Sequence, residues 1–503
     1  MSIKLLRNAL YIKIVSTLKT HKFELAAVLF LVAISSWLRL WKIEGHMTFL
    51  GDEGRDALVL LNMFKDGKFT LLGPAASVGG FFLGPAYYYL VIPGFLFSGM
   101  SPVGMATEVA VLGALSVMIL YWLVRGRLGT VPAFFASLTY AVSPTIVTFS
   151  RSSWNPNVMP FLSLCIFSSL LLAKEKNNKL FYYFTGALFG LAIQSHYLGL
   201  ILFLPIFIIS TVFSFPGIKK TIITYFLITV GFFTTFLPFL LFEIRHGFTN
   251  TTTIFTFITK PAGAVGIRNF QYDDNLLSAI SRLFKETYSI NKSDLSLFVG
   301  IIVLLLALIS LVKLKSRKSK NLYFIIFTWV ISGVIGIGFY NGELYNYYFA
   351  FLFPVPFLLS SLIVSIFSYS KTINTVIIVL LCILSIYLLP KNIIFQSPSN
   401  QLKTARSVAN KVIELSNDKP YNFALMASGN TDYAYRFFLE AQKKKPSPIE
   451  EKITDQLIVI CEEKDCRYNL SPLPQIISFG PRELDLEVDF IPGHIKIFRL
   501  VHP

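Results

Sequence analysis

Charged side chains are scarce in this sequence. Asp, Glu, Lys and Arg together make only 15% of its 503 residues, against about 25% in soluble globular proteins. Hydrophobic residues make 54%, and the mean hydropathy is +0.61. This composition excludes an ordinary soluble domain and indicates a helical protein with several membrane spans.

Acidic residues are the scarcer of the two charge types, with 28 Asp and Glu against 45 Lys and Arg, a net charge of +17. Such an excess can indicate nucleic-acid binding, but here the basic residues gather in short loops between apolar runs, which indicates cytoplasmic loops instead. These residues are Lys4, Arg7, Lys13, Lys19, Lys22, Arg125, Arg127, Lys174, Lys176, Lys179, Lys219, Lys220, Lys313, Lys315, Arg317, Lys318, Lys320 and Lys371. We therefore expect no nucleic-acid partner and a surrounding of membrane lipids.

Apolar runs of about 17 to 25 residues, each long enough to cross a bilayer, recur from Phe23 to Pro390. The basic loops share one face if there are about eleven spans. The predicted spans are 24–41, 103–124, 130–149, 158–173, 180–196, 197–214, 221–242, 296–313, 321–339, 347–368 and 372–390. The run 80–98 contains Pro85 and Pro93 and is predicted not to cross, because crossing would put Arg125 and Arg127 outside. The first run lacks a cleavage pattern and is expected to remain as a span.

This topology divides the chain into three parts. We expect a basic cytoplasmic segment (1–22), a transmembrane domain (23–390) with large outer loops at 42–102 and 243–295, and an extracytoplasmic domain (391–503). Strand-like runs at Gln456–Cys461 and Ile495–Val501 and a helix-like run at Leu402–Glu414 predict a small α/β domain. It has no nucleotide-binding fingerprint and no hydrolase motif, so recognition or scaffolding is the role expected of it.

Cysteine is rare, with four residues in the chain. Cys165 and Cys382 fall within predicted spans. Cys461 and Cys466 lie in the predicted outer domain, where either a disulfide or a zinc site could use them, although two cysteines without a second pair of ligands are few for zinc.

Ionisable and amide side chains are concentrated at the predicted outer face. Any one of them could simply be solvated, but their loops must converge above a single helical bundle. The group consists of His46, Asp52, Glu53, Arg55, Glu108, Arg151, Asn155, Asn157, His196, Glu243, Arg245, His246 and Glu343.

An enzyme acting on the outer face has no access to nucleotide sugars or ATP, so a transferase there needs a donor carried in the membrane. A polyprenyl phosphate fits this need. Its phosphate requires cationic contacts, for which Arg55, Arg151, Arg245 and His246 are candidates. The acceptor hydroxyl requires a base, for which Asp52 is the candidate.

The aromatic and amide residues Tyr87, Tyr88, Trp154, Asn155 and His196 are expected to line the path of the substrates. A purely structural alternative for Asp52 is that it caps the following helix.

The chain resembles the GT-C membrane glycosyltransferases, and most closely the dolichyl-phosphate-mannose protein mannosyltransferase superfamily, which includes the aminoarabinose lipid A transferases. The resemblance is carried by the pair Asp52-Glu53 after the first span, by Arg55, by a Gly-Pro-x-Tyr-Tyr segment and by a small-residue second span ending at Arg125-Gly-Arg127. It is strongest over 46–150.

The resemblance implies that Asp52 is catalytic, that Glu53 is its neighbour and that Arg55 contacts the phosphate or the donor. Some relatives use a divalent cation, which makes Asp52 a candidate metal ligand. The family often has Lys-Pro-Pro before the aromatic pair, where this chain has Leu83-Gly84-Pro85. The departure leaves the phosphate contact in this loop undetermined.

We therefore predict a glycosyltransferase that moves a sugar from a polyprenyl-phosphate donor to a lipid, glycan or protein acceptor at the cell membrane. A lipid-linked glycan polymerase or ligase is the main alternative, although it would rely on arginines and a histidine in later loops. A transporter is a weaker alternative, because the spans carry almost no charged groups at their centres.

Overall fold

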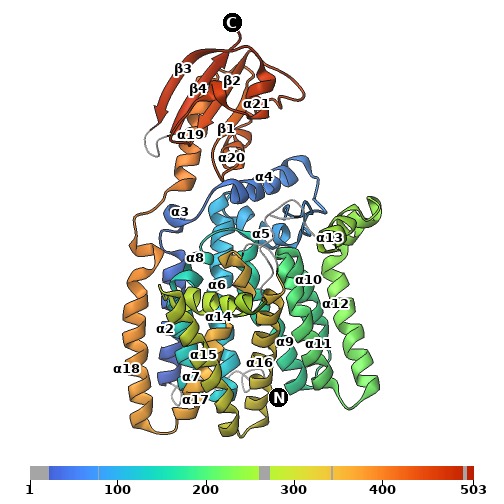
Figure 1. Cartoon of the computed structure of the whole chain (residues 1–503), viewed down its shortest axis with the longest axis vertical. Helices are drawn as coiled ribbons and strands as arrows, with labels where there is room; N and C mark the ends of the chain where they lie inside the picture. The colour runs from blue at the N-terminus through green and yellow to red at the C-terminus, as the bar shows by residue number, and fades with distance from the viewer. Residues whose placement is uncertain (1–21, 77–78, 260–271, 341–343, 491–494) are drawn as a thin grey trace, which may run out of the picture.

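The computed structural model describes residues 22–76, 79–259, 272–340, 344–490 and 495–503. Nearly all of the N-terminal segment and Glu343 lie outside these ranges. The described part is a bundle of long helices with a small mixed domain at one end (Figure 1), so the predicted fold class is confirmed.

Eight described helical segments are long and apolar enough to cross a membrane. They are α2 (Lys22–Leu40), α6 (Pro102–Leu128), η1 with α9 (Asn155–Lys176), η2 with α11 (Tyr197–Ser214), α12 (Ile218–Arg245), α15 with η3 (Ser293–Lys313), α16 (Arg317–Gly338) and α18 with η5 (Lys371–Lys391). A ninth span is formed if η4 (Asn346–Leu352) and α17 (Val355–Phe367), which meet at 45°, are counted together. The chain is therefore a multi-pass membrane protein.

The remaining two of the eleven predicted spans are shorter helices. In the range 130–149, α7 (Thr130–Val142) ends where Pro144 begins the separate helix α8 (Pro144–Phe149). In the range 180–196 the helix is α10 (Leu180–Ser195). At 1.5 Å per residue these helices measure about 20 and 24 Å, less than the roughly 30 Å of a hydrocarbon core.

The run 80–98 contains α5 (Ala86–Phe97), which has 12 residues. At about 18 Å it is shorter than the roughly 30 Å of a hydrocarbon core.

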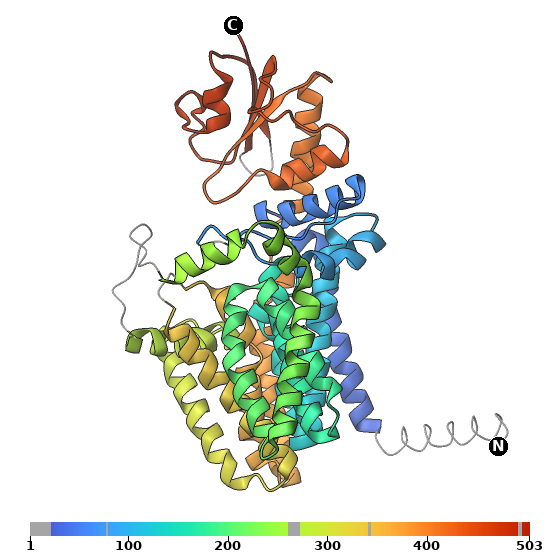
Figure 2. The same ribbon diagram turned by 90° about the vertical axis from the view of Figure 1, so that its right-hand side faces the viewer.

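Ion pairs fix one end of the bundle. Arg125 and Arg127 at the end of α6 pair with Glu24 of α2 and with Glu175 of α9. The opposite end carries α3 (Ile43–His46), α4 (Gly51–Asp66), α5 and the C-terminal domain (Figures 1 and 2), and is called the domain end below. The first predicted outer loop and the C-terminal domain thus share one side of the bundle.

Close helix packing depends on small residues, as is usual in membranes. A Cβ atom at Gly186 of α10 would lie 1.8 Å from the Ile228 carbonyl of α12, and one at Gly231 of α12 would lie 2.0 Å from the Tyr183 carbonyl of α10. Elsewhere in the bundle, Trp329 of α16 is buried and stacks on Phe167 of α9, with ring centroids 4.1 Å apart.

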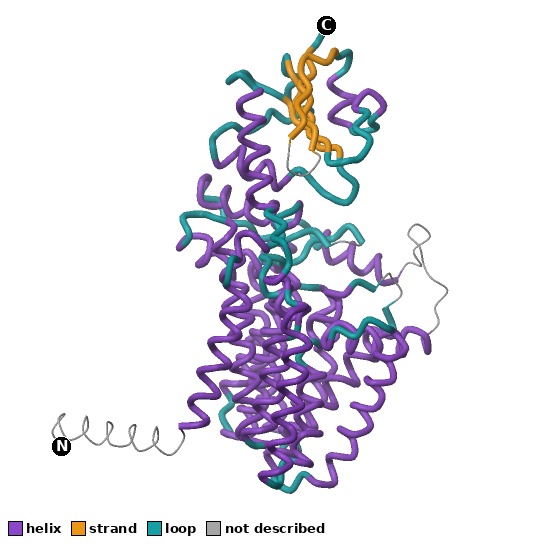
Figure 3. Tube along the Cα trace, turned by 90° about the vertical axis from the view of Figure 1, so that its left-hand side faces the viewer, coloured by secondary structure: helices purple, strands orange, loops and turns teal. Residues whose placement is uncertain are grey.

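The C-terminal domain contains a four-stranded sheet of order β1-β2-β4-β3, and Figure 3 shows all the strands together there. The strands are β1 (Asn422–Met426), β2 (Gln456–Cys461), β3 (Glu483–Phe490) and β4 (Ile495–Val501). The pair β1–β2 is parallel, and β4 runs antiparallel to both β2 and β3. The predicted strands β2 and β4 and the predicted helix, α19 (Gln401–Leu415), are confirmed.

The central strand β2 is buried on both faces. Leu457, Val459 and Cys461 share a hydrophobic cluster with Ile476 of α21 (Pro474–Phe479). The alternate residues Ile458 and Ile460 belong to the core that also contains α19 and α20 (Tyr433–Ala441).

The core that contains α19 and α20 continues into the transmembrane domain. Phe49, just before α4, packs edge-on against Phe437 and Phe438 of α20, with centroids 6.1 and 5.7 Å away. Helix α4 is thus held between the bundle and the C-terminal domain, and it carries the acidic pair.

Candidate active site

The first turn of α4 carries Asp52 and Glu53, where the helix dipole favours negative charge. The Glu53 carboxylate accepts a hydrogen bond from the Leu50 amide over 3.1 Å and so reaches back over the helix start. Asp52 lies inside the turn and makes no bond at the N-cap. The geometry therefore gives the capping interaction to Glu53 and not to Asp52.

Asp52 belongs to a compact charged cluster. Arg55 donates to Asp52 Oδ1 over 2.6 Å and to Asp56 Oδ1 over 2.9 and 2.8 Å. The Asp52 side chain is 49% exposed, whereas Asp56 is fully buried. Arg55 thus links a buried carboxylate to an accessible one and fixes the orientation of Asp52.

Burial changes the proton affinity of this cluster. It raises the pKa of Glu53 to about 7 and that of Asp56 to about 6, although Arg55 opposes the shift of Asp56. Burial alone would lower the pKa of Arg55, but the carboxylates of Asp56 and Asp52 raise it above its ordinary value. Arg55 is therefore protonated, and its charge is paired with the carboxylates of Asp52 and Asp56.

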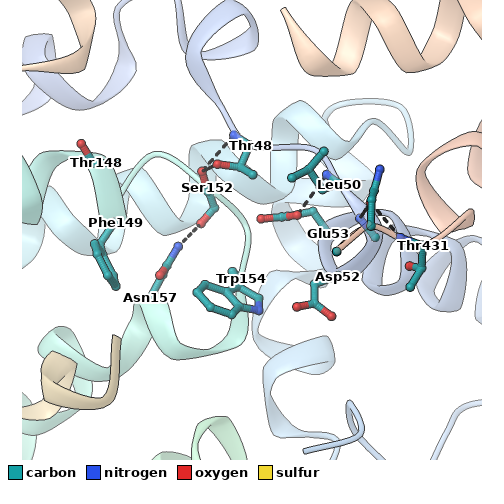
Figure 4. A pocket seen from close by; sticks show the side chains of 13 residues that line it. Thr48, Leu50, Asp52, Glu53, Thr148, Phe149, Ser152, Trp154, Asn157 and Thr431 are labelled. Carbon is teal, nitrogen blue, oxygen red and sulfur yellow. Dashed lines mark hydrogen bonds between the residues drawn. The ribbon is translucent and has the colours of Figure 1, made fainter. Parts of the chain in front are cut away.

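A cavity of about 490 Å³ opens beside this cluster (Figure 4). It is lined by Thr48, Leu50, Gly51, Asp52, Glu53, Thr148, Phe149, Ser152, Trp154, Asn157, Gly429, Asn430 and Thr431. The lining contains two carboxylates, several uncharged polar groups and two aromatic rings, and none of these thirteen residues is basic. In the close-up the Asp52 carboxylate points into the space beside the Trp154 ring.

The cavity wall is built from three distant parts of the chain. Ser152 Oγ accepts from the Thr48 amide over 3.0 Å, and the Ser152 carbonyl accepts from Asn157 Nδ2 over 2.9 Å. On the opposite side, the Gly51 amide donates to Asn430 Oδ1 over 2.9 Å. The α4 segment, the loop after α8 and the C-terminal domain all contribute to it.

A smaller pocket of about 30 Å³ lies on the other side of Asp52 and Trp154 and is also lined by Arg55, Asn155, His196 and Tyr347. Asn155 Nδ2 donates to the Ser195 carbonyl over 2.7 Å. His196 is buried and its Nδ1 accepts from the Leu198 amide over 3.2 Å. Burial lowers the pKa of His196 to about 3, so this histidine is neutral and is no phosphate-binding cation.

The predicted aromatic pair lies beneath the charged cluster. The Tyr87 hydroxyl is 2.7 Å from Ser153 Oγ, and Tyr88 lies beside Asp56 and Arg55. Both phenols are almost fully buried, which raises their pKa well above the usual range. Tyr87 and Tyr88 therefore pack against the buried side of the charged cluster. Neither residue lines the two pockets around Asp52.

The predicted cationic clamp is not assembled. Arg151 is fully buried and donates to the carbonyls of Leu38 and Trp41 over 2.7 Å each, so it caps the end of α2 instead. Arg245 and His246 are exposed at the end of α12, where His246 stacks on Phe242, and neither lines the two pockets around Asp52. Of the four predicted cations, only Arg55 is beside Asp52.

Two other predicted outer residues, Glu243 and Glu108, have structural partners. Glu243 accepts from the Thr251 amide over 2.7 Å, Glu108 accepts from the Gly94 amide over 2.5 Å, and His46 is buried. These bonds join neighbouring elements and lie away from the cavity lining.

A second large cavity, of about 440 Å³, lies between α14 (Tyr272–Tyr288) and α15 and was not predicted. Its lining includes Arg282, Lys285, Glu286, Asp294 and Asn346. The sequence signal that could have indicated it is the pair Arg282 and Lys285, three residues apart and so on one face of an amphipathic helix.

The predicted cation site at Asp52 lacks the required ligands. Among the described residues, no group of three or more His, Cys, Asp or Glu side chains could hold a metal ion. Glu53 is occupied by the Leu50 amide and Asp52 by Arg55. The residues around Asp52 therefore do not fit a divalent cation.

The chain was compared with protein-family models and with known proteins. Residues 84–242 match the family model of dolichyl-phosphate-mannose-protein mannosyltransferase, a stretch that includes Trp154 and excludes Asp52. No curated protein matches the sequence.

Two solved proteins share the fold. ArnT from Cupriavidus metallidurans in the apo state is similar with a TM-score of 0.62 and 12% identity, over 94% of this chain and 97% of that chain. The same protein bound to undecaprenyl phosphate matches with a TM-score of 0.62 and 11% identity, over the same shares of the two chains. AglB, the archaeal oligosaccharyltransferase from Archaeoglobus fulgidus, in complex with an inhibitory peptide and a dolichol-phosphate, matches with a TM-score of 0.52 and 14% identity, over 90% and 71%. The family model and these structures agree with the resemblance to this superfamily, and the chain has the fold of the GT-C membrane glycosyltransferases.

Proposed function

We propose that this protein is an integral membrane glycosyltransferase, which moves a sugar from a polyprenyl-phosphate donor to an acceptor hydroxyl with Asp52 as the base. The observation that carries the proposal is the position of Asp52 in the wall of the cavity at the domain end of the bundle. Two proteins of the same fold have been solved with undecaprenyl phosphate and with dolichol-phosphate, which supports a lipid-borne donor.

The lining of this cavity is chemically suited to a sugar. The rings of Trp154 and Phe149 offer apolar faces to the C–H groups of a pyranose, and Thr48, Ser152 and Asn157 offer polar groups to its hydroxyls. Its lack of basic residues disfavours a phosphate there. The sugar and the acceptor would therefore occupy this cavity, with the carrier phosphate outside it.

In the proposed step the acceptor oxygen attacks the anomeric carbon of the donor. The bond from that carbon to the phosphate oxygen breaks, and polyprenyl phosphate leaves with the electron pair. Asp52 takes the proton of the acceptor hydroxyl. Arg55 holds one Asp52 oxygen, and the half-exposed side chain leaves the carboxylate accessible from the cavity.

For the carrier phosphate, the residues that fit are Arg282 and Lys285. Arg282 donates to the carbonyl of Leu344, a short distance along the chain from Tyr347, whose ring lies 4.5 Å from that of Trp154. The cavity around Arg282 also lies at the start of α15, where Leu295 and Phe298 are exposed as on a lipid-facing helix. Burial raises the pKa of Glu286 in the same cavity, and Lys285 and Arg282 oppose this shift.

The test uses the purified full-length protein in lipid nanodiscs. It is incubated with polyprenyl-phosphate sugars extracted from membranes and with membrane glycolipids as acceptors, and the release of free polyprenyl phosphate is measured by mass spectrometry. We expect release that requires both the protein and the acceptor fraction. Binding of undecaprenyl phosphate without release from any lipid-linked sugar fraction would contradict the transferase assignment.

A further inference from the structure

The first turn of α4 rests directly on the C-terminal domain. A Cβ atom at Gly51 would lie 2.1 Å from Thr431 Oγ1, and one at Gly54 would lie 2.3 Å from the Ala434 amide nitrogen. Both glycines are needed for this approach, and both flank Asp52 and Glu53 in the sequence. The placement of Asp52 therefore depends on the segment 430–434, almost four hundred residues further along the chain.

Asn430 makes the polar contact in this interface. Its Oδ1 accepts from the Gly51 amide over 2.9 Å, at the start of α4, and also from the Thr431 amide over 2.9 Å. Its Nδ2 donates to Glu462 Oε2 over 3.0 Å and to Oε1 over 3.2 Å. Because a carboxylate only accepts hydrogen bonds, Glu462 fixes the orientation of the amide and presents its oxygen to Gly51.

Glu462 is itself held on two sides. The Tyr435 hydroxyl donates to its Oε1, and its backbone amide donates to the Met426 carbonyl over 2.9 Å. It also lies within the short loop closed by the disulfide between Cys461 and Cys466. Cys461 is the last residue of the buried strand β2, so the loop is tied to the sheet.

We propose that Asn430 and Glu462 are positioning residues for Asp52 and that the Cys461–Cys466 disulfide, by closing the loop that carries Glu462, makes sugar transfer dependent on the redox state of the C-terminal domain. This inference rests on the proposed function, and it gives the domain a part in the reaction besides recognition. Reduction adds two electrons and two protons to the disulfide. A dithiol supplies both and becomes a disulfide, whereas a phosphine supplies the electrons and becomes its oxide while water supplies the protons and the oxygen. The products are two thiols and a loop that is free to move away.

The charges in this network permit a matched test. In Asn430→Asp, a carboxylate faces Glu462 and the donor to Glu462 is lost, so both like-charge repulsion and a missing bond act on the first turn of α4. In Asn430→Asp combined with Glu462→Gln, the donor and acceptor are exchanged, and the total charge equals that of the wild type. A carboxylate then still accepts from Gly51, and an amide at 462 donates to it.

We expect Asn430→Asp to lower kcat for transfer at least tenfold, and the double variant to recover to within about threefold of the wild type. Lys464→Ala, in the same disulfide loop but exposed, is the matched control and should behave as the wild type. If the bond between Asn430 and Glu462 had only a structural role, Asn430→Asp would lower thermal stability and leave kcat per folded molecule unchanged. An absence of rescue in a double variant that folds would overturn the pairing of Asn430 with Glu462.

A second measurement does not depend on catalysis. Amide hydrogen exchange over 50–56 should rise in Asn430→Asp and after reduction of the wild type with a phosphine, and it should return in the double variant. Unchanged exchange would overturn the inference whatever the activity. An inactive wild type whose exchange responds as expected would contradict the proposed function and leave the positioning role standing.

Discussion

At the start of α4 the structure separates an accessible carboxylate, Asp52, from a buried one, Glu53. The salt bridge of Asp52 to Arg55 is half exposed, so its contribution to stability is of the order of 1 kcal/mol or less. Glu53, its neighbour in the sequence, is buried and bonds to the start of the helix. Substitutions at these two adjacent positions should therefore have different consequences.

Asp52→Asn retains the size of the side chain and removes the proton acceptor. We expect the thermal unfolding temperature to change little and the rate of transfer to fall about 100-fold or more, the usual effect of losing a general base. Asp66→Asn, at the exposed end of the same helix, is the control and should retain full activity. Both quantities are measured on one purified preparation, and a fully active Asp52→Asn protein would exclude this residue as the base.

Glu53→Gln should change the pH dependence of stability. Between its ordinary pKa of 4.5 and its folded value of about 7, Glu53 keeps its proton in the folded state and loses it on unfolding. Stability from this group is therefore present below pH 4.5 and declines as the pH rises to about 7, by up to about 3 kcal/mol. Glutamine can still accept from Leu50 and does not titrate.

The difference in unfolding temperature between Glu53→Gln and the wild type should thus grow in favour of the variant from pH 4.5 to pH 7 and then level off. Differential scanning fluorimetry across this range measures it. Glu44→Gln, at an exposed position before α4, should show no such trend. A constant difference across the range would mean that Glu53 is not buried as an acid.

At the scale of helices and strands, most of the fold could be predicted, because apolar runs and alternating strands are local properties of the sequence. The strands Gln456–Cys461 and Ile495–Val501 have the predicted bounds. Two of the eleven predicted spans are shorter helices than expected, and in one of them a run of apolar residues does not show where Pro144 divides it into two helices.

The site could be predicted only in part, for a related reason. Asp52, Glu53 and Arg55 are close in sequence and on one turn, so their motif is visible. Asn430 meets Gly51 across 379 residues, and only the docking of the C-terminal domain brings them together. The sequence predicts Arg151 as a phosphate contact. It does not indicate that two backbone carbonyls at the end of α2 accept hydrogen bonds from this side chain instead.

Helix α14 contributes a prediction at this scale. If Lys285 and Arg282 bind the carrier phosphate, Lys285→Ala should raise KM for the lipid-linked donor by about 10-fold or more, and kcat should fall as well. The reason is that the contact is present in the bound donor and strengthens when the leaving phosphate takes the electron pair and gains negative charge. Lys292→Ala, at an exposed cation just before α15, is the control. An unchanged KM for the donor would exclude Lys285 from carrier binding.

For the molecule as a whole, the orientation in the membrane decides whether the lipid-carrier argument applies. The domain end carries the α4 helix and the C-terminal domain, and the opposite end carries the ion-paired Arg125 and Arg127. The excess of basic residues at that opposite end predicts that it is cytoplasmic. Asp52 would then face the outside, where no nucleotide sugar is available.

Cysteine labelling tests this orientation directly. In a background with Cys165 and Cys382 replaced by alanine, a single cysteine is introduced as Lys419→Cys in the exposed turn after α19, or as Lys318→Cys near the start of α16. A maleimide that cannot cross membranes should label the first in intact cells and the second only after permeabilisation. Because α4 packs against the C-terminal domain, the opposite pattern would place Asp52 in the cytoplasm. The cavity at Asp52 would then be open to soluble nucleotide sugars, and the need for a polyprenyl-phosphate donor would disappear.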